Sequence, residues 1–548
     1  MRGESKKNHS FLMQGMILAG AGIITRLIGI AYRIPVNNIL GDEGQGFYGY
    51  AFSIYNIALL LTSYSLPLAV SKLVSARMAK EESKNAQRIL KGALAFAILV
   101  GALVSVLVFV FADTIAGKSL PLSVYALRVL APGLFIVAIM GVLRGYFQGM
   151  GTMVPTAISQ ILEQIVNAVV SIIGASYLLE MGKKIKDVNP SLPYAYGAAG
   201  GTLGTVSGAL VGLIFLVILM KRYYPTMQKM VFEDKTETAE RYKDIYKILL
   251  LTIAPVLLST AIYNVSDILD QSIFSNIMAH QGYKEKEIAA FLGMFTGKYN
   301  TLINIPLAIA NALGASLIPS LTATITKGTM KEVREKISMV IRVVMLIAIP
   351  SCVAFFVIPD RILSLLYRGN ITIPANMLRI GAISVVFFCL STVTNSILQG
   401  LNKMTTPVIH GAISLGIHLV VVVFLLIVPK WGIYSLVVGN LVFSLSMCLL
   451  NALAMKRATQ YHQELKKTYV LPVAASLVMG VVIAIAAYGF SLVMPDKLAT
   501  ILTIPIALVV YVMALIQCKA LSGSEIKAFP AGTKIFAVLK RLHMINEE

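Results

Sequence analysis

Apolar segments long enough to cross a lipid bilayer recur along almost the whole chain. A membrane-spanning α-helix needs about 20 predominantly apolar residues, and fourteen such segments follow one another with short connections. The chain is 57% hydrophobic and 13% charged, about half the charged fraction of a soluble domain, which excludes a soluble globule. We therefore predict an all-α polytopic membrane protein. The predicted spans are residues 11–40, 46–73, 89–112, 121–146, 153–179, 195–220, 248–276, 290–320, 337–358, 372–399, 405–428, 433–455, 469–494 and 499–519.

The charge distribution predicts the orientation in the membrane. A net charge of +21 would suggest nucleic acid in a soluble protein, but no basic stripe interleaves with aromatic residues as such binding requires. Cytoplasmic loops of membrane proteins are enriched in Lys and Arg, which places both termini on the cytoplasmic side of the membrane. The loop with Lys183, Lys184 and Lys186 runs against this trend. The basic clusters lie at residues 77–91, 221–247, 327–336 and 456–467.

An internal repeat predicts two lobes. Span 4 has an arginine after a leucine and, twenty residues later, Gln-Gly followed by Met and Pro, and span 10 repeats this pattern. Matching positions about 250 residues apart are Arg128 and Arg379, Asp113 and Asp360, and the pairs Tyr55-Asn56 and Tyr299-Asn300. Two six-helix copies with the same orientation are typical of two-lobed alternating-access transporters. The predicted parts are an N-terminal lobe (1–222), a cytoplasmic basic linker (223–247), a C-terminal lobe (248–457), spans 13 and 14 (458–520) and a cytoplasmic tail (521–548).

Basic residues inside predicted spans are candidate ligands, because a charge near the bilayer centre is costly and usually faces a cavity or a partner. Arg26 and Arg33 are seven residues apart and share one helix face. They either line a cationic cavity that holds an anionic headgroup or form structural ion pairs. Lys298, in span 8, either lines that cavity with Asn300 or extends its ammonium toward the membrane surface.

The remaining charged candidates leave their roles open. Asp267 and Asp270 share a face of span 7 and pair with the span 1 arginines, act in gating, or bind a coupling ion. Glu163 lies on a polar face of span 5, where it either makes a hydrogen-bonded helix contact or belongs to an ion site. Arg128 and Arg379 are secondary candidates, since each lies near the outer surface where its side chain reaches water.

No residue pattern predicts catalysis or a cofactor. The four cysteines lack paired spacing, and His410 and His418 have no carboxylate or cysteine at ligand spacing. A GxxxxGK[ST] loop for nucleotide phosphates is also absent. We predict a protein that is not an enzyme, with no metal site and no cofactor.

Three stretches carry a resemblance to a known family. They read TRLIGIAYRIPVNNILGDEGQGFYGYAFSIYN, SLPLAVSKLVS and, in span 8, NIPLAIANALGASLIPSLT. Over essentially its whole length the chain resembles the polysaccharide biosynthesis proteins of Gram-positive bacteria, which include stage V sporulation protein B and the MurJ-type lipid II flippases of the MOP superfamily. The resemblance implies a flippase that moves an undecaprenyl-pyrophosphate-linked sugar to the outer leaflet.

Site residues follow from this resemblance by position. It implies a cationic central cavity, a groove at spans 13 and 14 for the polyprenyl tail, and drive by membrane potential, Na⁺ or H⁺. Arg26 matches the family's first arginine in span 1, Arg33 matches the second with a shift of one residue, and Lys298 lies one turn from the arginine in span 8. The family's arginine in span 2 and its nearby acid have no counterpart, although Asp42 and Glu43 lie close. These departures favour a lipid-linked substrate broader than, or different from, lipid II.

Three other functions compete with a flippase. A cation-coupled multidrug exporter of the MATE branch predicts twelve spans and an acidic cavity. A non-transporting sporulation scaffold predicts that Arg26 is dispensable, and a membrane enzyme would need a catalytic cluster. We expect a monomer that contacts membrane lipids and a lipid-linked oligosaccharide.

Overall fold

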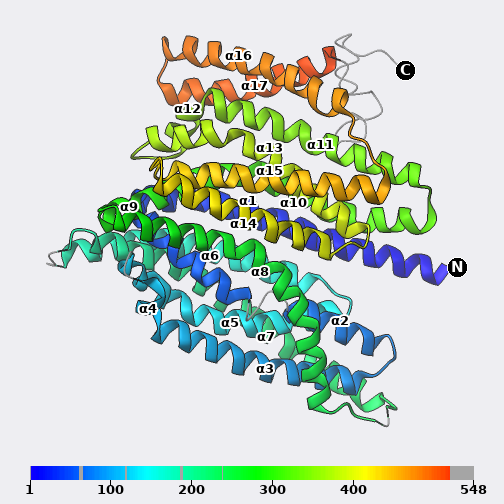
Figure 1. Cartoon of the computed structure of the whole chain (residues 1–548). Helices are drawn as coiled ribbons and strands as arrows, with labels where there is room; N and C mark the ends of the chain where they lie inside the picture. Colours follow the sequence, from blue (N-terminus) through cyan, green and yellow to red (C-terminus); the bar gives the residue numbers. More distant parts are fainter. Residues whose placement is uncertain (1, 61–65, 118–119, 186–188, 237, 519–548) are drawn as a thin grey trace. The chain divides into compact units, whose positions relative to one another are not determined.

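The structure is a computed structural model that describes residues 2–60, 66–117, 120–185, 189–236 and 238–518 (Figure 1). These residues form helices and turns, with no strand among them. Packing divides the chain into unit 1, Met1–Gly297, and unit 2, Lys298–Glu548. This boundary falls within the predicted span 8, so the two lobes that the sequence repeat indicates stay a prediction.

Unit 1 is built from helices that the apolar segments dictate, because backbone groups in a bilayer must bond within their own segment. Its helices are α1 (Arg2–Leu59), α2 (Leu66–Met78), α3 (Ser83–Val110), α4 (Ala112–Ala116), the short η2 (Pro121–Ser123), α5 (Val124–Gly149), α6 (Val154–Lys184), α7 (Leu192–Glu233), α8 (Tyr242–His280) and α9 (Glu285–Gly293).

Unit 2 begins inside a continuous helical segment, since α9 runs through the π-helical η3 (Met294–Tyr299) into α10. Its other helices are α10 (Asn300–Lys327), α11 (Met330–Val357), α12 (Pro359–Leu366), α13 (Thr372–Gly400), α14 (Thr405–Ile427), α15 (Tyr434–Thr459), η4 (Lys466–Val470), α16 (Leu471–Ser491) and α17 (Asp496–Gln517).

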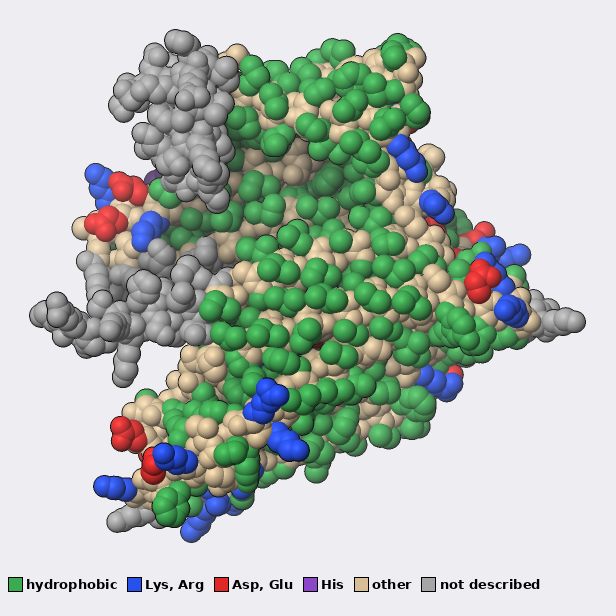
Figure 2. Space-filling view, turned by 180° about the vertical axis from the view of Figure 1, so that it is seen from behind, with side chains coloured by type: hydrophobic (Ala, Val, Ile, Leu, Met, Phe, Trp, Pro, Cys, Tyr) green, Lys and Arg blue, Asp and Glu red, His purple; other side chains and the backbone are tan. Residues whose placement is uncertain are grey.

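Ten helical segments in the described residues are long and apolar enough to cross a membrane. They coincide with predicted spans 3–6 and 9–14, for instance α13 with 372–399 and α14 with 405–428. The other four predicted spans are helical over most of their length but are not among these ten, so the count of fourteen stays a prediction. On the face drawn in Figure 2, apolar side chains cover the helices and charged ones gather near helix ends. Both features fit a multi-pass membrane protein.

The predicted break between the first two spans, 11–40 and 46–73, lies at a kink in α1. Two helices join there at Gly41, whose backbone is non-helical with a φ of 66° that favours glycine. The second of these helices ends at Leu59. A new helix, α2, begins at Leu66 with Pro67 in its first turn, where a proline costs no hydrogen bond.

Small residues set the closest packing inside unit 1. A Cβ built on Gly200 of α7 would lie 2.0 Å from the carbonyl oxygen of Gly174 on α6. The two backbones therefore touch, and only glycine fits at either position, as in other tightly packed membrane helices.

Helix α11 of unit 2 packs against the C-terminal pair α16 and α17, which lie side by side in Figure 1. Met479 and Ile483 of α16 form a core cluster there. The Tyr511 hydroxyl of α17 donates to the Leu346 carbonyl across 2.9 Å, which ties α17 to α11.

The connection between α7 and α8 is bound along the start of α3. Asp234 accepts a hydrogen bond from the Lys84 amide at 2.6 Å, and the Glu240 amide donates to Asn85 at 2.9 Å. The Glu240 carboxylate also pairs with Arg77. We call residues 234–236 and 238–241 the strap.

Candidate functional site

The two span 1 arginines lie on α1 of unit 1. Arg26 and Arg33 are both exposed, and each interacts with other groups of the molecule. Their spacing of seven residues puts them about two turns apart on one side of α1. Exposed guanidinium groups within a predicted membrane span are suited to an anionic partner, because arginine binds phosphate oxygens bidentately.

The two aspartates of span 7 differ in burial. Asp267 on α8 is exposed, whereas Asp270 is 2% exposed. Both interact with other groups, and neighbouring contacts join α8 to α1, where Tyr50 and Ser272 share a hydrogen bond of 3.4 Å. Their predicted pairing with the span 1 arginines, and their role in gating or ion coupling, stay predictions.

Glu163 has an ionic partner that the sequence analysis did not identify. On α6, its carboxylate accepts a hydrogen bond of 2.8 Å from Arg144 of α5, whose Nε also donates to Ser159 at 2.9 Å. The side chains are 12% and 21% exposed for Arg144 and Glu163, so the pair is largely shielded. One turn further along α6, Asn167 donates to Tyr32 of α1 at 3.3 Å. Glu163 therefore belongs to a polar layer between α1, α5 and α6.

Lys298 is fully buried at the beginning of unit 2. Its ammonium donates to the carbonyl oxygens of Arg368 and Asn370, at 3.0 and 2.8 Å. These two carbonyls belong to the connection between α12 and α13, so Lys298 holds that loop. Asn300, two residues on, is half-buried on α10. Whether either residue lines a cationic cavity stays a prediction.

Arg128 and Arg379 occupy matching corners of the two units. Arg128 of α5 pairs with Asp113 of α4 at 2.6 Å, and Arg379 of α13 pairs with Asp360 of α12. The four side chains are between 39% and 66% exposed. Each ion pair joins a short helix to the long helix that follows it.

The tyrosine of each repeated Tyr-Asn pair packs its hydroxyl on a glycine, five residues after Arg128 in unit 1 and two residues after Arg379 in unit 2. A Cβ built on Gly133 of α5 would lie 3.1 Å from the Tyr55 hydroxyl, and one built on Gly381 of α13 would lie 2.2 Å from the Tyr299 hydroxyl. We call the group of Tyr55, Asp113, Arg128 and Gly133 the first corner. Tyr299, Asp360, Arg379 and Gly381 form the second corner.

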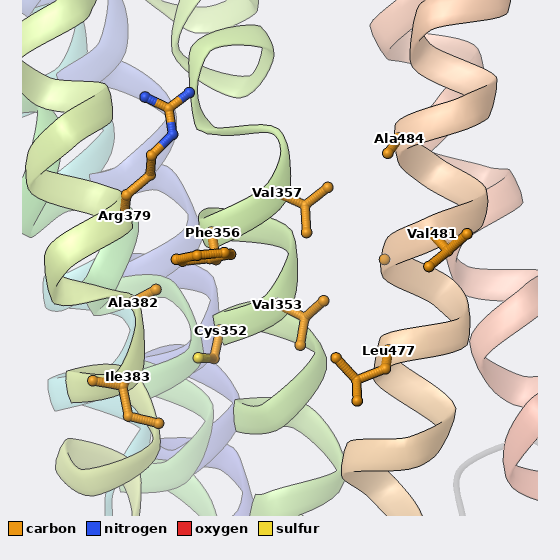
Figure 3. Close-up of a pocket in the computed structure, with 11 residues that line it drawn as sticks. Cys352, Val353, Phe356, Val357, Arg379, Ala382, Ile383, Leu477, Val481 and Ala484 are labelled. Atoms are coloured by element: carbon orange, nitrogen blue, oxygen red, sulfur yellow. The ribbon is translucent and has the colours of Figure 1, made fainter.

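An apolar cavity lies between α11, α13 and α16 of unit 2. Its volume is about 560 Å³, and Figure 3 shows Phe356, Ile383 and Leu477 from the three helices around it. Arg379 lines one end and points its guanidinium away from Ile383 (Figure 3). The cavity can hold an apolar chain, and α16 is one of the two helices that the resemblance assigns to a lipid groove.

Sequence reasoning missed two kinds of partner. Arg144 was not singled out within span 4 (121–146), and only the tertiary packing of α5 on α6 brings it to Glu163. Asp113 and Asp360 were noted as repeat positions without a role. An acid precedes the arginine in both copies, by 15 residues for Asp113 and by 19 residues for Asp360, and this recurrence was the signal that would have predicted the ion pairs.

Comparisons with known proteins agree with the fold and the resemblance. Among curated relatives, the lipid II flippase MurJ of Bacillus subtilis (strain 168) is 27% identical over 87% of this chain and 88% of its own. Stage V sporulation protein B of the same organism is 24% identical over 95% of this chain and 98% of its own. The chain thus spans most of the length of both relatives.

Solved structures of the MOP superfamily share the fold. The inward closed conformation of lipid II flippase MurJ matches with a TM-score of 0.65 at 14% identity, over 91% of this chain and 98% of that one. An inward-facing MATE transporter also matches with a TM-score of 0.65. The match has 15% identity and covers 82% of this chain and 99% of the transporter. The MatE family model matches residues 255–424. Residues 11–325, more than half of the chain, match the model of the polysaccharide biosynthesis proteins, and the chain belongs to that family.

Proposed function

We propose that the chain is a flippase for lipid-linked oligosaccharides. It moves an undecaprenyl-pyrophosphate-linked sugar, either lipid II or a related cell-wall or polysaccharide precursor, from the inner to the outer leaflet by alternating access. The observation that carries this proposal is the similarity of nearly the whole chain, in sequence and in fold, to lipid II flippase MurJ. Because no covalent bond changes in such transport, we propose no enzymatic activity.

In this proposal the exposed arginines of α1 bind the pyrophosphate. Arg26 and Arg33 supply fork-shaped donors for phosphate oxygens, and Lys298 and Asn300 are further predicted ligands. The headgroup crosses between leaflets along a shielded polar route, while the polyprenyl tail stays in lipid beside unit 2, where the 560 Å³ cavity offers an apolar surface. Asp267, Asp270 and Glu163 are the proposed groups for gating or ion coupling.

The setting of the proposed transporter follows from the charge pattern. Both termini lie in the cytoplasm, since the basic loops flank alternate spans. The protein works as a monomer without a cofactor. Its return to the inward-open state uses the membrane potential or a monovalent ion, Na⁺ or H⁺.

A multidrug exporter of the MATE branch is the second candidate. The match of residues 255–424 to the MatE model favours it. An exporter of organic cations requires an acidic cavity, whereas α1 exposes two arginines. A non-transporting sporulation scaffold, suggested by the similarity to stage V sporulation protein B, would not depend on either arginine.

Complementation of a bacterium depleted of its own lipid II flippase tests the proposal. We expect wild type to restore growth and Arg26→Ala to fail at equal protein level, because the pyrophosphate loses a bidentate partner. Lys229→Ala is the matched control, since Lys229 is an exposed cation of α7 outside the proposed site. Rescue by both Arg26→Ala and wild type would contradict the role of Arg26. Failure of well-expressed wild type would contradict lipid II transport and favour another lipid-linked sugar.

A further inference from the structure

The second half of α9 is fastened to α1 by direct backbone contact. A Cβ built on Gly46 of α1 would lie 1.9 Å from the carbonyl oxygen of Ala289 on α9, and one built on Gly293 would lie 1.8 Å from the carbonyl oxygen of Asp42. On its other side, Gly44 lies against the backbone of Tyr194 at the start of α7. We call the contact of residues 42–46 with residues 289–293 the α1–α9 joint.

Two carboxylates lie at this joint and fasten it to two further elements. Glu285, the first residue of α9, accepts a hydrogen bond of 3.0 Å from the amide of Leu122 in η2. Glu43 of α1 is 7% exposed, and its carboxylate faces Ser191, the residue before α7. Among the residues that the structure describes, no donor reaches Oε1 of Glu43, which is buried. A buried carboxylate oxygen without a donor is costly when ionised and can instead carry a proton.

Both carboxyl groups hold their protons more tightly than usual. Burial raises the pKa of Glu43, against the lowering effect of the Ser191 hydrogen bond and the Lys286 ammonium. Burial also raises the pKa of Glu285, the Leu122 amide lowers it, and the negative charge of Glu43 raises it again. Because the charge of Glu43 opposes the ionisation of Glu285, the titrations of the two carboxyl groups are coupled. Asp42 is the other acid of the joint, and it interacts with other groups of the molecule.

We propose that Glu43 and Glu285 form a coupled proton site that latches α9 onto α1. With a proton on the buried Glu43 carboxyl, the joint carries no buried negative charge at this position and stays closed. When solvent takes this proton, the buried Glu43 carboxylate is charged beside the half-buried Glu285, and α9 loosens from α1. The proton comes from bulk water on that side of the membrane and returns to it.

The latch acts on the segment that connects the two units. Helix α9 continues through the π-helical η3 into α10, and the division between the units falls at Gly297 and Lys298 inside η3. Loosening α9 therefore frees the unit 1 end of this connecting segment. The inference concerns a local equilibrium of the chain and does not rest on the substrate proposed above.

The sign of the pH dependence follows from the raised pKa values. The closed joint binds the proton more tightly than the open one, so its stabilisation is complete below the ordinary glutamate pKa of 4.5. This stabilisation is lost as pH rises through the raised values. Each unit by which the pair's pKa is raised changes the closing equilibrium about tenfold.

Hydrogen–deuterium exchange of the purified full chain in nanodiscs tests the latch. Protection factors, which divide out the intrinsic pH dependence of exchange, are measured for a peptide covering residues 285–293 at about pH 5 and pH 8. We expect protection in wild type to fall several-fold to tenfold at the higher pH. The variant Glu43→Gln/Glu285→Gln, which is permanently neutral and keeps its size, should hold the low-pH protection at both values.

Two controls make the result specific. Glu180→Gln removes an exposed carboxylate that pairs with Lys183, and it should show the wild-type pH dependence. A peptide from α3, residues 83–110, should keep its protection at both pH values. Equal wild-type protection at pH 5 and 8 would overturn the proposal even if the double variant failed to fold. A wild-type pH response in a folded double variant would overturn it as well. Neither result would affect the complementation test.

Discussion

The first and second corners share one arrangement of side chains, whereas the inner polar groups of the two units differ. At each corner a tyrosine hydroxyl packs on a glycine, and an aspartate of a short helix pairs with an arginine of the next long helix. Unit 1 also has an inner polar layer with the shielded charged pair of Arg144 and Glu163. Unit 2 has an inner polar layer that is neutral, in which Asn451 bonds His410 at 2.7 Å and Asn395 at 2.7 Å.

This difference separates what the fold requires from what it permits. The corner recurs in both copies because each must fix a short helix against a long one. The inner layer needs only satisfied polar groups, and an amide–imidazole cluster meets this need without placing charges in the membrane. A shielded ion pair costs more desolvation than a neutral cluster. Unit 1 has such an ion pair in spite of this cost. Arg144 and Glu163 are therefore better candidates for a functional role than the residues of the corners.

The largest expected effect breaks the inner charged pair. Arg144→Met leaves the Glu163 carboxylate largely shielded and without its arginine, and should lower the free energy of unfolding by about 3 kcal/mol. The neutral double variant Arg144→Met/Glu163→Met should recover most of that loss. Denaturant unfolding in detergent micelles measures both. A single variant as stable as wild type would show that the pair is weak.

The matched change in unit 2 should be milder. Asn451→Leu keeps the volume but removes the partner of His410 and Asn395, which costs about 1–2 kcal/mol for unmade hydrogen bonds. The same unfolding assay makes the comparison. If Asn451→Leu destabilised more than Arg144→Met, charge would not be what distinguishes the two layers.

The next largest effect on stability is expected for substitutions of the glycines at the two corners. Gly381→Ala would place a methyl group 2.2 Å from the Tyr299 hydroxyl, whereas Gly133→Ala would meet Tyr55 at 3.1 Å. We expect Gly381→Ala to cost about 1–3 kcal/mol and Gly133→Ala less. Adding Tyr299→Phe removes the clashing oxygen and should relieve part of the loss. Without such relief, the tyrosine contact would not be the cause.

The smallest effect is expected for the ion pairs at the corners. Arg128→Ala and Arg379→Ala remove exposed partners, so each should change stability by about 0–1 kcal/mol, and less at high salt. Thermal unfolding at low and high ionic strength tests this. A loss above about 2 kcal/mol in only one variant would break the equivalence of the two corners.

The sequence predicted the helices better than the contacts between them. Apolar length alone predicts helices such as α13 and α14 within a residue or two, because a bilayer leaves few other structures for such segments. The repeat of Arg128 and Arg379 likewise predicted equivalent positions. The partner of Glu163 could not be predicted, since which face of α5 meets α6 depends on the packing of both helices against α7.

Lys298 illustrates the same limit at the site. From the sequence it is a cation inside a span, and cavity lining and snorkelling were the alternatives. The structure buries it completely against two carbonyls of a connection some seventy residues away. Only a tertiary structure provides such acceptors, because backbone carbonyls carry no signature in the sequence.

The strap limits how the protein can be engineered. A loose connection between two halves of a transporter would be the obvious place to insert a fiducial domain for microscopy or to split the gene. The strap instead binds the beginning of α3 and the end of α2 through hydrogen bonds and an ion pair of Asp234 and Glu240. An insertion there would therefore disturb unit 1 itself. The exposed turn at Asn402 and Lys403 between α13 and α14 is a safer position for a fused domain.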